Sequence, residues 1–148
     1  MPDQLAKKVS VADVRVAIPT SPGVEAGAVI LREEDPPHRT FQIIIGQPEA
    51  RAIMAAWTGS APSRPSTWDL FVSSVGLLGG RVERAVVTGV EDGRHFFANL
   101  EIERDGQRLI LPGRPSDAIA LALRAHGATI YVAEQVLSEV GTPANPDN

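Results

Sequence analysis

Two stretches of the sequence decide the fold: residues 43–56, IIIGQPEARAIMAA, and residues 109–123, LILPGRPSDAIALAL. Each begins with a short apolar run typical of a strand, continues through a glycine and a proline, and ends in an alanine-rich segment. Proline is favoured at the first position of a helix, and an acidic residue beside it interacts well with the unpaired N–H groups there. The pattern therefore predicts a strand that leads into a helix twice, with helices at 48–57 and 116–125. The likeness suggests an internal duplication of a strand–helix–strand unit, with a chance match as the alternative.

The rest of the chain predicts strands in meanders. Valine-rich or alternating segments bounded by glycine, proline or Asp-Gly turns are typical of strands. Meanders interrupted by isolated helices favour an α+β fold, in which helices pack on a mainly antiparallel or mixed sheet. We expect one domain over residues 9–140, a flexible segment 1–8 and a flexible tail 141–148. Within it we expect strands at 9–18, 28–32, 40–46, 81–90, 95–104, 107–111 and 129–133, and further helices at 67–78 and 134–140.

The composition limits the classes of protein to consider. The chain has 148 residues, 14 Lys and Arg against 18 Asp and Glu, a net charge of −4 and no cysteine. The acidic balance argues against a strongly basic coat protein for nucleic acid, and the lack of cysteine excludes disulfides, thiolate zinc sites and a cysteine nucleophile. No apolar run approaches the roughly 20 residues of a membrane-spanning helix, and the first residues lack the apolar core of a secretory signal. We therefore expect a cytoplasmic protein that makes no membrane contact.

Acidic residues occur near the starts of three expected helices: Glu49, Asp69 and Asp117. Each has a structural interpretation, since an acid in the first turn stabilises a helix, and Asp69 follows Ser66 at capping-box spacing. Each also has a functional interpretation, as a general base or as a ligand of a divalent cation. The residues alone leave both interpretations open.

Arginine-proline pairs precede two of these helices, at Arg64-Pro65 and Arg114-Pro115. An arginine can bind a phosphate through two parallel N–H···O hydrogen bonds, and the free N–H groups at the start of a helix favour anions. If the three helix starts converge, their carboxylates would hold Mg²⁺ or Mn²⁺, and Arg64, Arg114 and Ser116 would hold phosphate. Carboxylates that hold a metal ion beside groups that hold a phosphate are what metal-assisted phosphodiester hydrolysis requires. Salt bridges between the arginines and the acids are the structural alternative.

Other catalytic motifs are absent from the sequence. The histidines His38, His95 and His126 lie at no metal-ligand spacing, and there is no G-x-S-x-G, Walker loop or G-x-G-x-x-G. We therefore expect no organic cofactor.

Three motifs together resemble the bifunctional nuclease domain family: residues 46–50, GQPEA, residues 64–70, RPSTWDL, and residues 114–122, RPSDAIALA. Segments 79–100 and 130–137 are similar to it as well, so the resemblance runs from about residue 9 to residue 140. It implies a compact α+β domain, often associated as dimers, with activity on DNA and RNA. The motif residues retained here are Glu49, Arg64, Asp69, Arg114 and Asp117.

The chain departs from the family pattern at two positions. The family's middle motif usually reads Arg-Pro-x-Thr-His-Asp-Leu, and Trp68 stands where the histidine is expected. The family's Gly-Glu-Pro-Glu-Ala reads Gly-Gln-Pro-Glu-Ala here, so Gln47 replaces an acid. A histidine is the natural proton carrier near neutral pH, and tryptophan cannot replace it in that role.

These observations leave three functional hypotheses. The first is a metal-assisted nuclease with Glu49, Asp69 and Asp117 as catalytic or metal-binding acids. The second is a weakened or non-catalytic member that binds an anion, nucleic acid or protein through the same surface. The third is a structural or regulatory homo-oligomer, and we expect a homodimer or larger assembly that buries part of the apolar helices 48–57 and 116–125.

Overall fold

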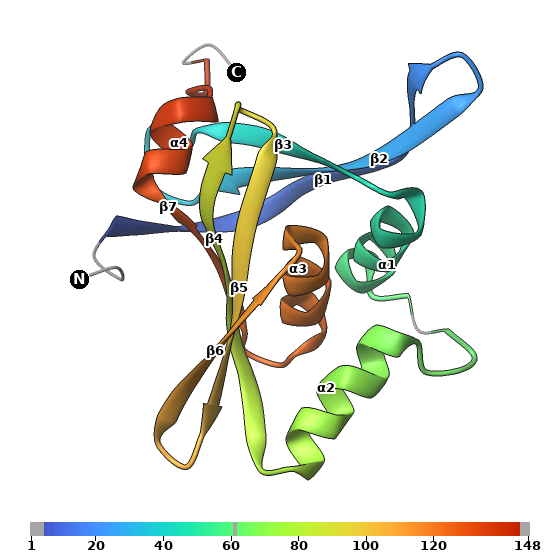
Figure 1. The fold of residues 1–148 in the computed structure, drawn as a ribbon, viewed down its shortest axis with the longest axis vertical. Coiled ribbons are helices and arrows are strands. Elements are labelled where there is room, and N and C mark those ends of the chain that lie inside the picture. Colours follow the sequence, from blue (N-terminus) through green and yellow to red (C-terminus); the bar gives the residue numbers. More distant parts are fainter. Residues whose placement is uncertain (1–4, 61, 146–148) are drawn as a thin grey trace.

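Seven strands and four helices make up the described part of the chain, residues 5–60 and 62–145 of a computed structural model (Figure 1). In chain order they are β1 (Ala6–Ser21), β2 (Val24–Glu33), β3 (Thr40–Ile45), α1 (Gln47–Thr58), α2 (Thr67–Leu77), β4 (Gly80–Glu91), β5 (His95–Arg104), β6 (Gln107–Gly113), α3 (Pro115–Arg124), β7 (Thr129–Ala133) and α4 (Glu134–Val140).

All seven strands belong to one mixed sheet in the order β3-β2-β1-β7-β4-β5-β6. Among the described strands, β4 and β7 are parallel neighbours, and every other neighbouring pair is antiparallel. The predicted α+β fold with a mixed sheet is therefore confirmed. Each half of the sheet is a three-stranded meander that leads into a helix, β1–β2–β3 into α1 and β4–β5–β6 into α3, and β7 lies between the halves.

The first hairpin is longer than the sequence predicts. Residues 19–27 read as a loop, but β1 continues to Ser21 and β2 begins at Val24, with Gly23 in the turn at φ 76°. The register between β1 and β2 shifts at three places along the pair. Such bulges bend a strand and interrupt its alternation. The interrupted alternation explains why the sequence pattern missed half of this hairpin.

Both ends of the domain are more ordered than predicted. β1 begins at Ala6 and pairs with β7, so the expectation of a flexible segment is wrong for residues 6–8. At the other end, Thr142 and Thr40 exchange backbone N–H···O bonds of 2.9 and 2.8 Å, and the Ala144 N–H donates to a carbonyl in the loop before β3. The expected flexible tail is therefore anchored as far as Ala144. Residues 1–4 and 146–148 lie outside the described residues.

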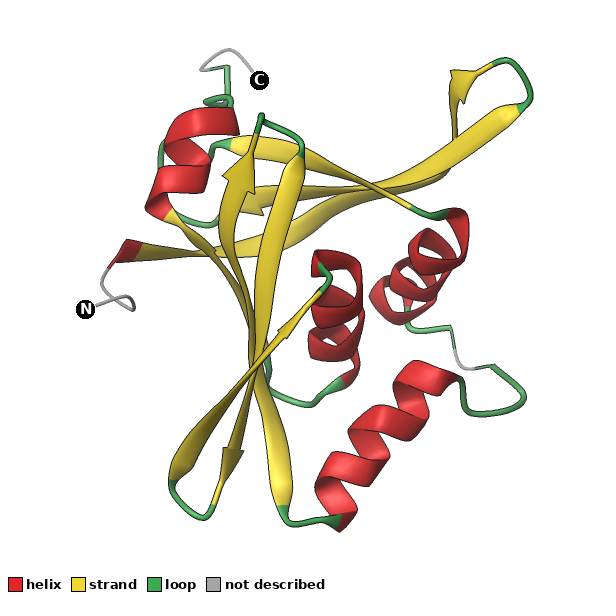
Figure 2. Ribbon diagram, viewed as in Figure 1, coloured by secondary structure: helices red, strands yellow, loops and turns green. Residues whose placement is uncertain are grey.

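Helices α1, α2 and α3 lie on one side of the sheet, and α4 lies apart from them beside β3, β4 and β7 (Figures 1 and 2). The α1 helix approaches β2 so closely that a side chain at Gly27 would collide with Ala50. α3 is the central helix, since Ser116 and residues 118–122 are all buried. The expectation that the apolar side chains of 116–125 need a second subunit is wrong, because this chain's own sheet and helices cover them. The large apolar side chains left exposed lie mainly on α2 and β6.

The sheet curls until its edge strand β3 meets β5. Phe41 of β3 and Phe96 of β5 stack with ring centroids 5.6 Å apart, although four strands separate β3 from β5 in the sheet order. Figure 1 shows β3 crossing near the start of β5. This curvature brings the starts of α1 and α3 and the β4–β5 turn to one place.

Candidate functional site

A cavity of about 210 Å³ lies where β3 leads into α1 and β6 leads into α3. We call it the α1/α3 pocket. Its floor and walls come from the end of β3, the β4–β5 turn and the first turns of both helices. The lining residues are Ile43, Ile44, Ile45, Gly46, Glu49, Arg94, Phe96, Arg114, Pro115 and Ser116.

Both helices begin at this pocket without a side-chain cap. Gly46 and Arg114 are the N-caps, both with extended backbone, and a proline occupies the first turn of each helix. The first helical hydrogen bonds run from Ala50 N–H to Gly46 O, at 3.0 Å, and from Ala118 N–H to Arg114 O, at 3.1 Å. The N–H groups that precede them are left for another acceptor, and the helix dipoles make this end of each helix attractive to anions.

Arg114 joins the acids of the two helices. Its Nε and Nη2 donate to the two carboxylate oxygens of Asp117 at 2.8 and 3.2 Å, and its Nη1 lies 3.4 Å from Glu49 Oε1. The Asp117 carboxylate raises the pKa of Arg114, and Glu49 adds to this. The structural alternative of a salt bridge therefore holds for Arg114. Its side chain is nevertheless 65% exposed, which leaves it room to turn toward a ligand.

A close contact at the N-cap of α1 positions Glu49. The carboxylate occupies the space that a Cβ atom of residue 46 would take, so only glycine fits there without displacing it. The Glu49 side chain is 17% exposed and remains in contact with the pocket.

Two polar groups of the pocket have no partner among the described residues. Arg94 is exposed in the β4–β5 turn, and its guanidinium makes no ion pair or hydrogen bond with them. Ser116 is 5% exposed, and its hydroxyl has no hydrogen-bond partner there either. Arg94 was not among the predicted site residues, because its tetrapeptide, Glu91-Asp92-Gly93-Arg94, indicates only a turn.

Asp69 lies away from this pocket. It completes the predicted capping box with Ser66, whose backbone N–H donates to Asp69 Oδ2 at 2.7 Å, and it accepts from Arg124 Nε at 3.2 Å. Arg124 is the last residue of α3, seven residues after Asp117, which is about 10 Å along a helix. The start of α2 therefore meets the far end of α3, and the expectation that all three helix starts converge is wrong.

The hydrogen bonds of Asp69 account for its electrostatics. The Ser66 backbone N–H holds the pKa of the Asp69 carboxyl below its usual range, and the Ser66 hydroxyl and Arg124 lower it further. Asp69 is thus an ionised structural group of the helix start, as its capping-box spacing indicates.

Two other motif residues lie with Asp69. Trp68 packs against the core, and the Arg124 guanidinium lies 5.8 Å from its ring centroid. Arg64 is exposed in the loop before α2 and makes no ion pair with any residue that the structure describes. Pro65 and Asp69 line a second cavity, of about 410 Å³, between α1, α2 and the end of α3.

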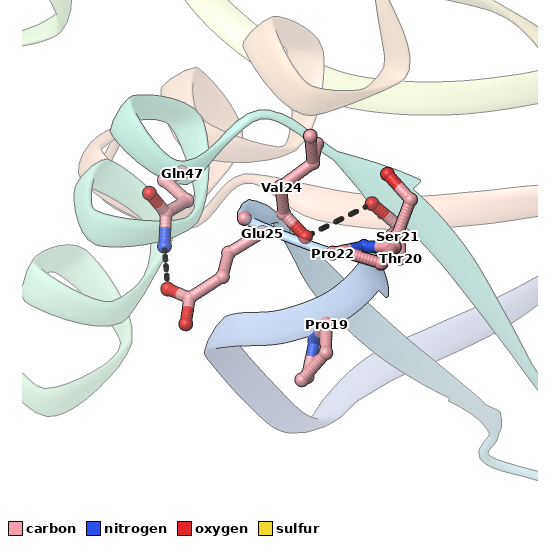
Figure 3. A pocket seen from close by; sticks show the side chains of 8 residues that line it. Pro19, Thr20, Ser21, Pro22, Val24, Glu25 and Gln47 are labelled. Atoms are coloured by element: carbon pink, nitrogen blue, oxygen red, sulfur yellow. Dashed lines mark hydrogen bonds between the residues drawn. The ribbon is translucent and has the colours of Figure 1, made fainter.

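Gln47 lies at the start of α1, but its side chain is directed to the first hairpin. Its Nε2 donates to Val16 O at 3.0 Å and to Glu25 Oε2 at 3.3 Å. Figure 3 shows this contact beside the hairpin residues that line a separate cavity. A glutamate at position 47 would place a carboxylate against these two acceptors, so the glutamine suits this environment.

The acids of the α1/α3 pocket are too few for a cage made of protein ligands alone. Within residues 5–60 and 62–145, no group of three or more His, Cys, Asp or Glu side chains could hold a metal ion. Mg²⁺, however, is usually held by one or two carboxylates together with substrate phosphates and water. Glu49 and Asp117, both within reach of Arg114, fit that smaller requirement.

Comparison with known proteins adds two findings. The sequence profile of the bifunctional nuclease domain matches residues 29–145. Two proteins of Mycobacterium tuberculosis, the uncharacterized protein Rv1829 of strain ATCC 25618 / H37Rv and the uncharacterized protein MT1877 of strain CDC 1551 / Oshkosh, are each 36% identical over 134 residues. Each match covers 90% of this chain and 76% of the relative. In the described part of the chain, no helix has the length and apolar character to span a bilayer.

Proposed function

Because this chain belongs to the bifunctional nuclease domain family, we propose that it hydrolyses phosphodiester bonds of DNA or RNA at the α1/α3 pocket. The observation that carries the proposal is the meeting of two uncapped helix starts, two arginines and Glu49 around one cavity, with Asp117 ion-paired to Arg114 beside it. Nucleases need groups that hold a phosphate and groups that activate water, and this pocket is where the chain brings both kinds together.

The phosphate would be held by Arg94, Arg114 and Ser116. The Arg94 guanidinium has no ion pair or hydrogen bond within the described residues, so it is available to an anion without the loss of an internal bond. The Ser116 hydroxyl and the N–H groups of both helix starts are donors on the same cavity. Donors fixed by helices are effective where negative charge develops, because they need no reorganisation during the reaction.

Glu49 and Asp117 would hold a divalent cation, Mg²⁺ or Mn²⁺. A bound cation supplies charge neutralisation for the phosphate and a water of lowered pKa. With a cation on these carboxylates, Arg114 would be free to turn to the phosphate. Asp69 and Trp68 take no part in this proposal, because they lie at the far end of α3, and Arg64 is not among the residues that line the pocket.

A second function is favoured by the ion pairs. Arg114 engages both carboxylates, and the position of the family's histidine is a tryptophan packed against the core. Both features fit a non-catalytic module that binds the phosphate groups of nucleic acid and leaves them intact.

A cleavage assay separates the two functions. Single-stranded and duplex DNA and RNA are incubated with the full chain in Mg²⁺, Mn²⁺ or a chelator, and D117N is compared with R51A, which alters an exposed arginine of α1 outside the pocket. A nuclease cleaves only with the cation, and D117N lowers the rate at least about 100-fold, as loss of an essential acid does. Binding without cleavage supports the second function. If the chain neither binds nor cleaves any of these nucleic acids, both proposed functions are contradicted.

A further inference from the structure

Phe97 of β5 is an aromatic side chain that the core does not use. Its neighbour Phe96 packs against the core and stacks on Phe41, whereas Phe97 is 50% exposed. Successive side chains of a strand point to opposite faces, so Phe97 lies on the face of the sheet away from the core. Within the described residues its ring makes no stacking or cation–π contact. A single exposed aromatic side chain is common on proteins, so its neighbours decide whether it has a function.

The two neighbours of Phe97 across the sheet are a glycine and an arginine. Phe97 pairs with Gly89 of β4, and a Cβ atom at position 89 would come 3.9 Å from the ring, so the ring lies beside a residue that has no side chain to cover it. On the other side the β5–β6 ladder ends with Ala98 opposite Gly113, and the next step along both strands brings Arg114 beside Phe97. The backbone of Arg114 is still extended, so its side chain starts on the same face as the ring.

Arg114 connects this ring to the α1/α3 pocket. It lines the cavity and its side chain is 65% exposed. The same cavity holds Ser116, which is 5% exposed and whose hydroxyl has no hydrogen-bond partner among the described residues. In a nucleotide a single sugar joins the base to its phosphate. A phosphate held by Arg114 and Ser116 would therefore leave its base close to the exposed ring.

We propose that Phe97 is a stacking platform for an unpaired base of a single-stranded nucleic acid whose adjoining phosphate lies in the α1/α3 pocket. The inference rests on the proposed function and specifies its substrate as single-stranded. In a duplex the faces of each base are covered by the neighbouring base pairs, whereas an unpaired base can leave the stack and lie on an aromatic side chain.

The charge of the chain is consistent with a contribution from stacking. The net charge is −4, so general attraction to the phosphate backbone contributes less than it does in a strongly basic protein. Stacking on an uncharged ring supplies affinity that does not depend on net charge. Since every base has a flat face, this platform would accept all four bases without sequence preference.

Oligonucleotides with and without bases test the proposal. Fluorescence anisotropy in chelator compares the binding of labelled oligothymidylate with that of a chain of the same length made of abasic sites, which keeps the phosphates and lacks the bases. The parent should bind oligothymidylate about tenfold more tightly, a gain within the range of one base–aromatic stack. Equal affinity for the two chains would overturn the stacking and leave the proposed phosphate binding intact. Absence of binding to both would contradict the proposed function as well.

Variants at position 97 assign the gain to this ring. F97L should weaken the binding of oligothymidylate about tenfold and leave the affinity for the abasic chain and for duplex DNA unchanged. F97W, which keeps an aromatic ring, should retain the preference of the parent for oligothymidylate. F71L, the matched control, removes a 38% exposed ring of α2 and should bind both chains like the parent. Unchanged affinity of F97L, an equal loss on both chains, or a loss in F97W or F71L as large as that in F97L would overturn the proposal.

Discussion

Arg114 is the residue on which the α1/α3 pocket depends, since it joins Glu49 of one helix to Asp117 of the other. The same ion pairs that hold the pocket together also neutralise its acids. A ligand that uses the pocket must therefore exchange these contacts for its own, which is why the exposure of the Arg114 side chain is relevant to function.

A substitution at Gly46 tests the placement of Glu49. G46A puts a methyl group where the Glu49 carboxylate lies, so the carboxylate must move away from the pocket. We expect at least a tenfold loss of cation-dependent cleavage with a melting temperature close to that of the parent. G113A, next to the other helix start and without a neighbour near its Cβ position, is the control. Equal activity of both variants would show that the position of Glu49 is irrelevant.

Trp68 tests whether the family's histidine position belongs to the proposed site. Because the ring packs against the core and Arg124, we expect W68H to reduce the free energy of unfolding by about 1–3 kcal/mol without a gain in cleavage rate. Thermal denaturation and the cleavage assay measure the two effects. A stable W68H with higher activity would contradict this placement and restore position 68 to the catalytic site.

At the scale of elements, the capping box of α2 gives a pH-dependent prediction. The folded-state pKa of Asp69 is lowered, so its stabilisation is complete above the unfolded pKa, near 4, and is lost as pH falls through the folded value. D69N should therefore reduce the free energy of unfolding by about 1–2 kcal/mol at pH 7, and the difference from the parent should shrink below about pH 4. Urea denaturation at several pH values measures it. E139Q, at an exposed acid of α4, should show no such difference, and a constant difference for D69N at all pH values would contradict the assignment.

The elements that the sequence predicts best are those with local signals. Pro48, Pro115 and the Ser66 box mark three helix starts within a residue or two, and the predicted strand 129–133 and helix 134–140 match β7 and α4. The first hairpin was underestimated because bulges break its alternation. Glu49, Arg114 and Asp117 were predicted as neighbours because each lies at the start of one of the two repeated helices.

What the sequence could not predict depends on the path of the whole chain. Arg94 reaches the pocket only because the sheet curls and brings the β4–β5 turn to β3. The sequence wrongly predicts Asp69 beside Glu49 and Asp117, because the loop between α1 and α2 carries the start of α2 to the far end of α3. Neither event leaves a pattern in neighbouring residues.

On the scale of the whole molecule, Arg39 ties α4 to the sheet. It donates to Glu33 of β2 and Glu134 of α4, with closest distances of 2.8 Å, and these bonds lower the pKa of both acids. R39M leaves the 3% exposed Glu33 side chain without its cation, so we expect a loss of about 3–5 kcal/mol in the free energy of unfolding. R15M, at the exposed pair with Asp13, should lose about 0–1 kcal/mol. Urea denaturation compares them, and equal losses would contradict the role of Arg39.

The central claim is that the α1/α3 pocket binds the phosphate groups of nucleic acid, and oligonucleotide affinity tests it most directly. Fluorescence anisotropy of a labelled single-stranded oligonucleotide is measured in chelator, which prevents cation-dependent cleavage, for the parent, R94A and R51A. Since the Arg94 guanidinium makes no ion pair or hydrogen bond with other described residues, R94A should keep the fold and weaken binding about tenfold, which corresponds to about 1.4 kcal/mol, and R51A should bind like the parent. Equal affinity of R94A and the parent would contradict the claim.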